Sequence, residues 1–539
     1  MTGLISAHLR EEARPLTSLP PSGHGEWSYH VTAMVCGAIL GLAAPGFEQW
    51  YLPWFWTTSL LLLTFSSASP WTAGVRGFCF GLGYNLVYLS WLLTFRSAYC
   101  EGTLASFPQL AATAIWLMLA AWQALYVSIF PCLIKAMPLV SGWLPARLSG
   151  KWHWPTYVVL PIAWVLIDRM CNTTQLLGFP WSPLHYSQYK QLAVIQVASL
   201  IGGVGISAWI MLVNANLAAL VASASLFKAK ASLGIDLSMI AFGSKKQLIA
   251  NCTLTALLTV LLLWFGYTRL ESDSRAIKDK VLFTALQAGV SIKAHKVSVN
   301  TVLNRYLELS AKSPNDTVCV WPEWSLAFNV SGKTPILKSA ASLASRYKQS
   351  WLLGVFDKDA QGRLYNTVCA IKQNGEVLPG LYHKRYLVPV GEYTPDWIRH
   401  TPIGTLIYGA NKEYVDMSSG ETPAVFAFDK VKVSPVICFE NLSPQICSAS
   451  IRAGGEVLID ASDNSWFCRS ILSDQMVSFC VMRAVENHRS FVFATALGPS
   501  TIIDSSGHIL AQAGREVSAS ISTELPIERD LTPYTRWCF

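Results

Sequence analysis

The sequence has 539 residues, of which 52% are hydrophobic and only 14% are charged, with a net charge of +8. Soluble proteins usually contain about 25% charged residues, so the composition argues against a chain that is soluble throughout. The positive charge does not indicate nucleic-acid binding, because no Lys/Arg cluster with interleaved aromatic residues occurs. The thirteen cysteines show neither the spacing of a zinc site nor that of a disulfide framework.

The acidic residues are divided unevenly between the two halves of the chain. Residues 1–270 contain seven of the 33 Asp and Glu residues. A long segment this poor in charge is typical of a membrane domain. The sequence therefore predicts a membrane domain followed by a soluble one.

Residues 1–30 are polar and rich in proline, without the continuous apolar stretch of a cleaved signal peptide. Between residues 31 and 270, uncharged stretches follow one another, and several reach the roughly 20 residues that cross a bilayer. We expect about seven crossings, at 31–47, 52–70, 77–95, 108–134, 155–167, 191–227 and 248–267.

The distribution of basic residues predicts the orientation in the membrane. With the N-terminus inside, ten Lys and Arg residues lie in the inner segments and three in the outer segments. Cytoplasmic loops carry the excess of basic residues in membrane proteins. Seven crossings would then place everything after residue 270 on the outer side.

From about residue 275 the pattern becomes that of an α/β domain. Strands are predicted at 281–287, 317–321, 351–356, 365–372, 431–438, 457–461, 491–495 and 501–504. Helices are predicted at 297–311, 335–347, 443–453 and 471–487. Strands that alternate with helices over some 250 residues predict a sheet covered by helices.

The strand at 431–438 ends on Cys438, followed by Phe439 and Glu440. In α/β folds, reactive groups are presented at the carboxyl ends of strands. A buried cysteine taken alone is more often an inert small hydrophobic residue. Pro435 donates no ladder hydrogen bond, which predicts an edge position or a bulge in this strand.

Two further residues, Glu323 and Lys384, stand at predicted strand ends or adjoining loops. Taken alone, Glu323 is a solvated carboxylate and Lys384 part of a surface cluster. Together with Cys438 they supply what acyl transfer through a thiol requires. Such a reaction needs a nucleophile, a base that later protonates the leaving group, and a cation for the oxyanion. No metal and no cofactor is needed.

This combination resembles the nitrilase (carbon–nitrogen hydrolase) superfamily and, more closely, the apolipoprotein N-acyltransferase family. The resemblance covers most of the chain. Its motifs are the loop Gly178-Phe-Pro-Trp181, WPE at 321–323, the run 382–393, CFE at 438–440, DNSWF at 463–467, Met482-Arg483-Ala484 with Glu486, and residues 531–536.

The resemblance implies a role for each candidate residue. Glu323 would be the general base and acid, Lys384 the oxyanion stabiliser and Cys438 the nucleophile, with Glu392 and Glu440 supporting them. Phe439 stands where the family more often has Tyr. Another departure is at 288–296, where Ala288 replaces a Gly and His295-Lys296 stand where a Trp is usual; it is expected to alter the fit of the acyl chain or head group.

The implied architecture is a polytopic α-helical membrane domain joined to an α-β-β-α sandwich. We expect a polar segment at 1–30, a membrane domain at 31–270, a catalytic domain at 275–530 and a tail at 531–539. The family's usual last transmembrane helix is not expected in this tail.

The implied reaction transfers a fatty acyl chain from a membrane phospholipid to the α-amine of a diacylglyceryl-cysteine lipoprotein, through a thioester on Cys438. The expected location is the bacterial cytoplasmic membrane, with the catalytic domain in the periplasm. Two alternatives stay open. One is a membrane-tethered amidase with water as the acceptor. The other is a transporter or scaffold with a non-catalytic nitrilase fold, whose transport site would be Asp168-Arg169.

Overall fold

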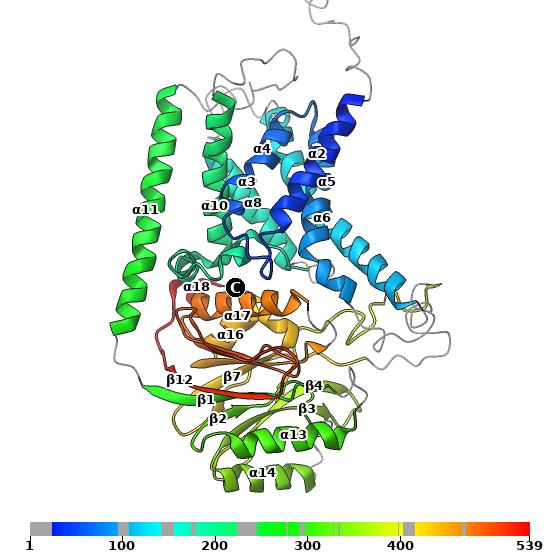
Figure 1. Ribbon diagram of the computed structural model, residues 1–539, viewed down its shortest axis with the longest axis vertical. Coiled ribbons are helices and arrows are strands. Elements are labelled where there is room, and N and C mark those ends of the chain that lie inside the picture. Colours follow the sequence, from blue (N-terminus) through cyan, green and yellow to red (C-terminus); the bar gives the residue numbers. More distant parts are fainter. Residues whose placement is uncertain are drawn as a thin grey trace, which may run out of the picture.

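The computed structural model describes residues 24–94, 107–141, 156–173, 179–223, 245–275, 279–291, 297–326, 328–331, 335–396, 398–402, 416–465 and 470–538. Helices from the first half of the chain stand together above a part built from strands and helices of the second half (Figure 1). The predicted division of the chain into a helical and an α/β part is therefore visible in its architecture.

All regular elements that the structure describes in the upper part are helices. Its longer helices are α2 (His24–Gly41), α5 (Pro70–Tyr88), α6 (Pro108–Ser141), α8 (Thr156–Thr173), α10 (Ala198–Ser223) and α11 (Lys245–Arg275). Its short elements are α3 (Pro53–Trp56), α4 (Thr58–Phe65), η1 (Ser90–Thr94), η4 (Leu184–Gln188) and α9 (Leu192–Ile195). Local sequence explains where α5 begins, because Pro70 occupies its first turn and the Ser69 side chain accepts the N–H of Thr72.

Within the described residues, three helices are long and apolar enough to cross a membrane: Gln109–Met137, Ala198–Ala222 and Lys246–Arg275. All seven predicted stretches contain helix, but the stretch 52–70 forms α3 and α4 in place of one long helix. At 1.5 Å per residue, the eight residues of α4 extend only about 12 Å. The number of crossings stays a prediction.

The lower part contains two six-stranded sheets, ordered β12-β1-β2-β3-β4-β5 and β11-β10-β9-β8-β7-β6. The first sheet comprises β12 (Ala519–Pro526), β1 (Lys280–Gln287), β2 (Val318–Val320), β3 (Ser350–Lys358), β4 (Leu364–Ile371) and β5 (Tyr382–His383). The second comprises β11 (Ile509–Gln512), β10 (Thr501–Ile503), β9 (Ser490–Thr495), β8 (Val457–Ser462), β7 (Lys432–Ile437) and β6 (Phe426–Ala427).

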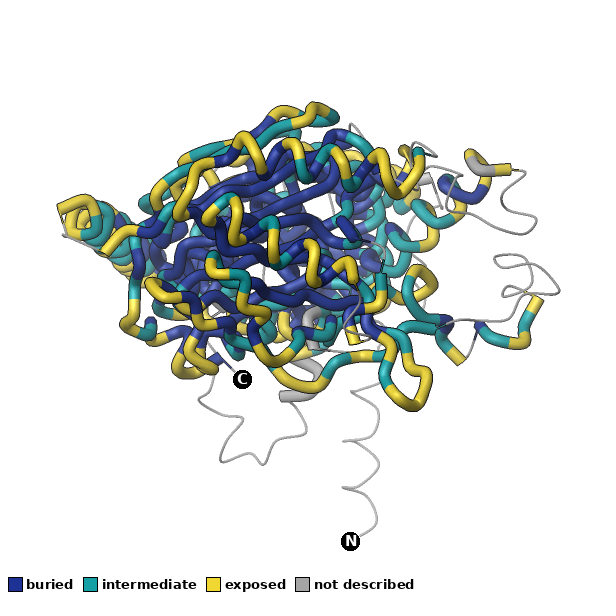
Figure 2. The backbone as a smooth tube through the Cα atoms, turned by 90° about the horizontal axis from the view of Figure 1, so that it is seen from below, coloured by how far each residue is buried: buried dark blue, intermediate teal, exposed yellow. Residues whose placement is uncertain are grey.

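Helices cover the outer face of each sheet, which confirms the predicted α-β-β-α sandwich. Helices α13 (Val299–Lys312) and α14 (Pro335–Tyr347) pack on the first sheet, away from the membrane helices. Helices α16 (Pro444–Arg452) and α17 (Leu472–Asn487) cover the second sheet on the opposite side. The two sheets share one apolar core, and seen from below the strands are dark blue inside more exposed helix faces and loops (Figure 2).

The predicted strands and helices of this part are all present, with ends that differ by a few residues. The strands β5, β6, β11 and β12 and the helix α18 (Pro533–Trp537) were not predicted. Pro435 lies in β7 beyond the short pairing with β6, which involves only Lys432 and Val433. At Pro435 the strand pairs with β8 alone, so the expected edge-like position is confirmed.

Helix α17 joins the two parts of the molecule, because nearly all of its residues are buried between the second sheet and the membrane helices. Helix α10 is interrupted at Gly202, where φ is +74°. The freed N–H of Gly203 donates a 3.0 Å hydrogen bond to Glu486 Oε1 on α17, and Arg483 Nη2 donates to the same oxygen at 2.9 Å. A buried ion pair of the sandwich thus satisfies a broken turn of a membrane helix.

Candidate active site

The structure brings Glu323 and Lys384 together next to Cys438. Glu323 follows β2, Lys384 follows β5 and Cys438 follows β7, so all three lie where strands end. Lys384 Nζ lies 3.4 Å from Glu323 Oε1 and 2.8 Å from Glu392 Oε1. The Cys438 thiol lies close enough for the charges of Glu323 and Lys384 to shift its pKa in opposite directions.

The carboxylate of Glu323 is held at both oxygens. Oε1 accepts a 2.5 Å hydrogen bond from Asn366 Nδ2, and Oε2 accepts one of 2.8 Å from the backbone N–H of Asp463. Burial raises the pKa of Glu323, the ammonium of Lys384 opposes this shift, and the charge of Glu392 adds to it. A carboxylate whose pKa is raised toward neutrality is suited to accept a proton and return it.

Lys384 is almost completely buried, with 1% of its side chain exposed. Burial alone would lower the pKa of its ammonium, but the carboxylates of Glu323 and Glu392 outweigh burial and raise the pKa well above its usual value. The residue is further fixed by its backbone N–H, which donates to the carbonyl of Asn366 at 2.8 Å. The site thus keeps a permanent cation at a defined position.

Cys438 has a left-handed backbone, with φ at +54°. This conformation is unusual for a residue with a side chain and costs about 1–3 kcal/mol. Its backbone N–H donates a 2.7 Å hydrogen bond to Asp460 Oδ1, at the end of neighbouring β8. A nucleophile on a strained turn after a strand is presented clear of its own sheet.

The thiol is neutral before it reacts. Burial raises the pKa of Cys438 most, the carboxylates of Glu323 and Asp460 raise it further, and Lys384 and Ser462 only partly offset these effects. Because the pKa lies well above the ordinary value of a thiol, a thiolate does not exist in advance. The sulfur therefore needs a base at the moment of attack.

Glu440 is fully buried and supports the site from behind. Its oxygens accept hydrogen bonds from Tyr382 Oη at 2.6 Å and from the backbone N–H groups of Ile437, Arg385 and Tyr386 at 2.7, 2.6 and 3.0 Å. These bonds join the end of β7 to the segment that carries Lys384. Glu440 therefore positions two of the three predicted residues.

Phe439 faces an aromatic cluster that the two halves of the chain build together. Its ring stacks at 5.7 Å on Trp181 and at 6.3 Å on Phe179, from the segment before η4, and at 5.3 Å on Tyr386. Trp181 also donates to Gln475 on α17. Apolar rings from the membrane part thus lie beside the residue that follows the nucleophile.

Two polar residues of the site, Asn366 and Asp460, were not predicted from the sequence. Asn366 donates to both Glu323 and Glu392, at 2.5 and 3.1 Å. Asp460 holds Cys438. Each interrupts a buried, mainly apolar strand, and a charged or amide residue in such a place was the available signal.

Some motif residues lie outside the described residues, namely Gly178, His295, Lys296, Trp466 and Phe467.

Comparison with known proteins agrees with this architecture. Residues 308–529 match the family model described as carbon-nitrogen hydrolase. The sandwich and its site thus define a carbon–nitrogen hydrolase-type domain joined to membrane helices. Residues 36–216 match the model described as the apolipoprotein N-acyltransferase N-terminal domain.

Relatives match over almost the whole chain. A protein named apolipoprotein N-acyltransferase from Geobacter metallireducens is 27% identical over 94% of this chain and 91% of its own length. A protein of the same name from Pseudomonas paraeruginosa is 27% identical over 95% of this chain and 92% of its own length. The chain is thus similar to apolipoprotein N-acyltransferases over almost its whole length, and the resemblance that its motifs predicted is confirmed.

A solved structure, Nit3 of Saccharomyces cerevisiae, a member of the nitrilase superfamily, covers 46% of this chain and 90% of its own length, with 19% identity and a TM-score of 0.36.

Proposed function

We propose that this protein transfers a fatty acyl chain from a membrane phospholipid to the α-amine of a diacylglyceryl-cysteine at a lipoprotein N-terminus, through a thioester on Cys438. The observation that carries the proposal is the meeting of a neutral thiol, a buried carboxylate and a permanent ammonium at three strand ends. Similarity to apolipoprotein N-acyltransferases supports acyl transfer to lipoproteins, and the geometry supports the roles of Cys438, Glu323 and Lys384.

In the first half-reaction, Glu323 accepts the proton of the Cys438 thiol while the sulfur attacks the ester carbonyl of the phospholipid. The carbonyl oxygen becomes an oxyanion, which the Lys384 ammonium stabilises. The N–H of Cys438 is already donated to Asp460, so the cation carries more of this stabilisation. Collapse of the intermediate breaks the ester C–O bond, and Glu323 returns its proton to the departing lysophospholipid.

In the second half-reaction, the free α-amine of the lipoprotein attacks the thioester carbonyl. Glu323 accepts a proton from the nitrogen, and Lys384 again holds the oxyanion. Collapse breaks the C–S bond, an amide forms, and the sulfur takes the proton back from Glu323. Two substrates that react in turn at one nucleophile give ping-pong kinetics.

The surroundings of Phe439 support access from the bilayer. Rings of Trp181 and Phe179 from the membrane part stack on it, so an acyl chain that leaves the bilayer would meet apolar surface beside the nucleophile. We further propose that residues 31–270 form the membrane domain and residues 275–530 the catalytic domain. The basic residues of the first half favour the bacterial cytoplasmic membrane with the catalytic domain on the periplasmic side.

The test is to trap the acyl-enzyme. Purified protein is incubated with labelled phosphatidylethanolamine without an acceptor, and the peptide that contains Cys438 is analysed by mass spectrometry. We expect a fatty acyl adduct that hydroxylamine removes. The adduct should be absent in Cys438→Ala and present in Cys447→Ala, which removes a buried cysteine in α16. Acyl groups on other residues, or none, would refute the mechanism.

Adding a diacylated lipopeptide then separates the proposal from the alternatives. Discharge of the adduct into a triacylated peptide supports the transferase. Discharge only into free fatty acid supports an amidase-type hydrolase that uses water. Full acyl transfer by a double variant, Asp168→Asn with Arg169→Gln, would leave a transport function without its predicted site.

A further inference from the structure

A second cavity lies away from the Cys438 site, at the end of α11. It has a volume of about 440 Å³ and is formed by the last turns of α11, His488 and residues 530–533. None of the residues around Cys438 lines it. The cavity therefore needs an explanation of its own.

The cavity lies where α11 passes from apolar to polar sequence. Helix α11 is one of the three candidate spans, and only 6% of its most apolar window is buried within the protein. Just before the cavity, Trp264 and Tyr267 are 63% and 64% exposed. Exposed Trp and Tyr at a helix end are typical of the membrane–water boundary, so the cavity lies at the level of lipid head groups.

One wall of the cavity carries an unused cation. Arg269 lines the cavity, and its Nε is shielded from solvent and has no hydrogen-bond partner. Among the described residues, its guanidinium forms no ion pair within 4.0 Å. The carboxylates of Asp273 and Glu528 act on this guanidinium from a distance but do not bind its shielded Nε. A shielded polar group without a hydrogen bond is costly, and phosphate is a group that Arg binds well.

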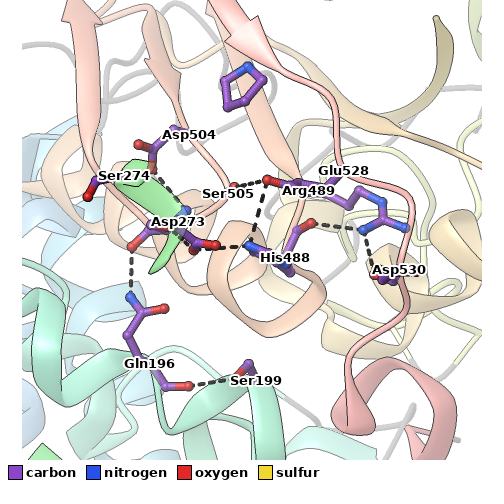
Figure 3. A network of polar contacts seen from close by, with 12 residues as sticks. Gln196, Ser199, Asp273, Ser274, His488, Arg489, Asp504, Ser505, Glu528 and Asp530 are labelled. Carbon is purple, nitrogen blue, oxygen red and sulfur yellow. Dashed lines mark hydrogen bonds and ion pairs between the residues drawn. The ribbon is translucent and has the colours of Figure 1, made fainter. Parts of the chain in front are cut away.

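An anion, Asp530, lines the same cavity. The carboxylate of Asp530 forms no hydrogen bond or ion pair with the part of the chain that the structure describes. Its backbone is fixed, because Arg489 Nη1 donates to the Asp530 carbonyl at 2.9 Å (Figure 3). Asp530 and Arg269 line one cavity without pairing with each other.

The other acidic groups nearby are occupied. His488 Nε2 lies 3.1 Å from Asp273 Oδ2 and 3.9 Å from Glu528 Oε1 (Figure 3). Asp273 Oδ2 also accepts from Ser506 Oγ at 2.6 Å, and Glu528 Oε1 from Ser505 Oγ at 3.3 Å. This cluster joins α11 to the sandwich. Arg269 feels the charges of Asp273 and Glu528, and Asp530 lies near the guanidinium of Arg489, but among the described residues neither Arg269 nor Asp530 has an ion-pair partner within 4.0 Å.

We propose that this cavity binds the head group of a membrane phospholipid that carries both a phosphodiester and a primary amine. Arg269 binds the phosphodiester oxygens, and Asp530 accepts hydrogen bonds from the ammonium. The acyl chains lie along the exposed apolar face of α11. This lipid-binding site is separate from the site of acyl transfer at Cys438, and the proposal does not depend on that reaction.

The test uses the full-length Cys438→Ala protein, which cannot consume the lipid by the proposed route, in bilayers of phosphatidylglycerol. The probe is phosphatidylethanolamine with a photo-reactive group on the acyl chain next to the glycerol. After irradiation, cross-linked peptides are identified by mass spectrometry. We expect adducts on residues 264–273 and 530–533, which excess unlabelled phosphatidylethanolamine removes.

Variants of the two charged residues show whether the cross-links come from specific binding in the cavity. Arg269→Gln and Asp530→Asn should each lower the labelling about tenfold, since each removes a hydrogen bond to a charged group. Arg269→Lys, which keeps the charge, should retain more of the labelling than Arg269→Gln. Arg275→Gln is the matched control. Among the described residues, this exposed arginine of the same helix pairs only with Glu271, so its loss should leave the labelling unchanged. Unchanged thermal unfolding confirms that each variant is folded.

Several results would overturn the proposal. Equal labelling of wild type and Arg269→Gln would identify ordinary annular lipid. Equal competition by phosphatidylcholine, which has the phosphodiester but no primary amine, would show that the amine is not recognised. Displacement by water-soluble glycerophosphoethanolamine at the same concentration as the lipid would assign the cavity to a free phosphodiester instead of a membrane lipid.

Discussion

The backbone N–H of Cys438 donates a 2.7 Å hydrogen bond to Asp460 Oδ1 while the cysteine holds a φ of +54°. The second oxygen of Asp460 accepts from Asn441 Nδ2 at 2.8 Å. A buried carboxylate on one strand thus fixes the strained turn that carries Cys438 at the end of the next strand. This position has an electrostatic consequence, because its charge raises the pKa of the Cys438 thiol.

The first prediction concerns Asp460→Asn. The amide oxygen can still accept the Cys438 N–H, and Asn441 can turn its own unpaired side-chain oxygen toward the new NH₂ group. The turn is then kept. Burial raises the pKa of Asp460, so at a pH where this carboxyl is ionised the substitution removes one negative charge and lowers the pKa of Cys438. Alkylation of Cys438 by iodoacetamide, followed peptide by peptide across pH, should begin at lower pH than in wild type.

Asp279→Asn, at an exposed residue of the sandwich, is the control and should leave the alkylation profile unchanged. A midpoint for Asp460→Asn that stays in place or moves to higher pH would contradict the assigned electrostatic effect.

The second prediction concerns the oxyanion. Lys384→Met removes the only cation within 4.0 Å of Glu323 among the described residues, and a lost oxyanion donor costs about 10²–10³ in rate. Lys384→Arg should not restore the rate, because a planar guanidinium does not replace a compact ammonium. The measurement is the single-turnover rate of Cys438 acylation. Lys372→Met, at a half-buried lysine that pairs with Glu376, is the control and should keep the wild-type rate.

The third prediction concerns Glu440, which accepts four hydrogen bonds in a buried position. In Glu440→Gln, the new NH₂ group faces a donor, which leaves buried groups unpaired at a cost of about 1–3 kcal/mol. The temperature of unfolding should fall, and acylation should slow because the Lys384 segment shifts relative to β7. Glu376→Gln, which breaks only an exposed pair with Lys372, should change neither.

The sequence was sufficient to predict the fold of the second half because its buried strands and amphipathic helices are long and regular. Strands such as β5 and β6 contain two residues each, too few to form a pattern. They exist because neighbouring strands provide partners, and this information is not local. The same holds for 52–70, where α3 and α4 pack against other helices in place of one continuous span.

The sequence could single out Glu323, Lys384 and Cys438, with the two glutamates beside them, because strand ends and family motifs mark them. The structure brings these residues together, and their catalytic roles stay a proposal. The contacts that hold these residues in position could not be predicted from the sequence. Asn366 acts through three-dimensional neighbours, Glu323 and Glu392, that lie 43 and 26 residues away in sequence. Phe439 was recognised only as a departure from Tyr, whereas its stacking on Trp181 requires the second half to pack against the first.

The last prediction concerns the pH dependence of acylation. Glu323 must be ionised to accept the thiol proton, and burial places its pKa above the ordinary value of a glutamate. The acylation rate should therefore rise with pH, and the midpoint of this rising limb of the pH–rate curve should lie above the ordinary pKa of a glutamate. The charge of Glu392 contributes to this upward shift, so Glu392→Gln lowers the pKa of Glu323 and moves the limb to lower pH, even where the maximal rate falls. Rates of Cys438 acylation, normalised to their maximum, measure this shift, and Glu376→Gln should reproduce the wild-type curve. A limb that moves upward in Glu392→Gln would mean that Glu392 acts mainly by holding Lys384 close to Glu323, through its 2.8 Å ion pair, and not through its charge on the base.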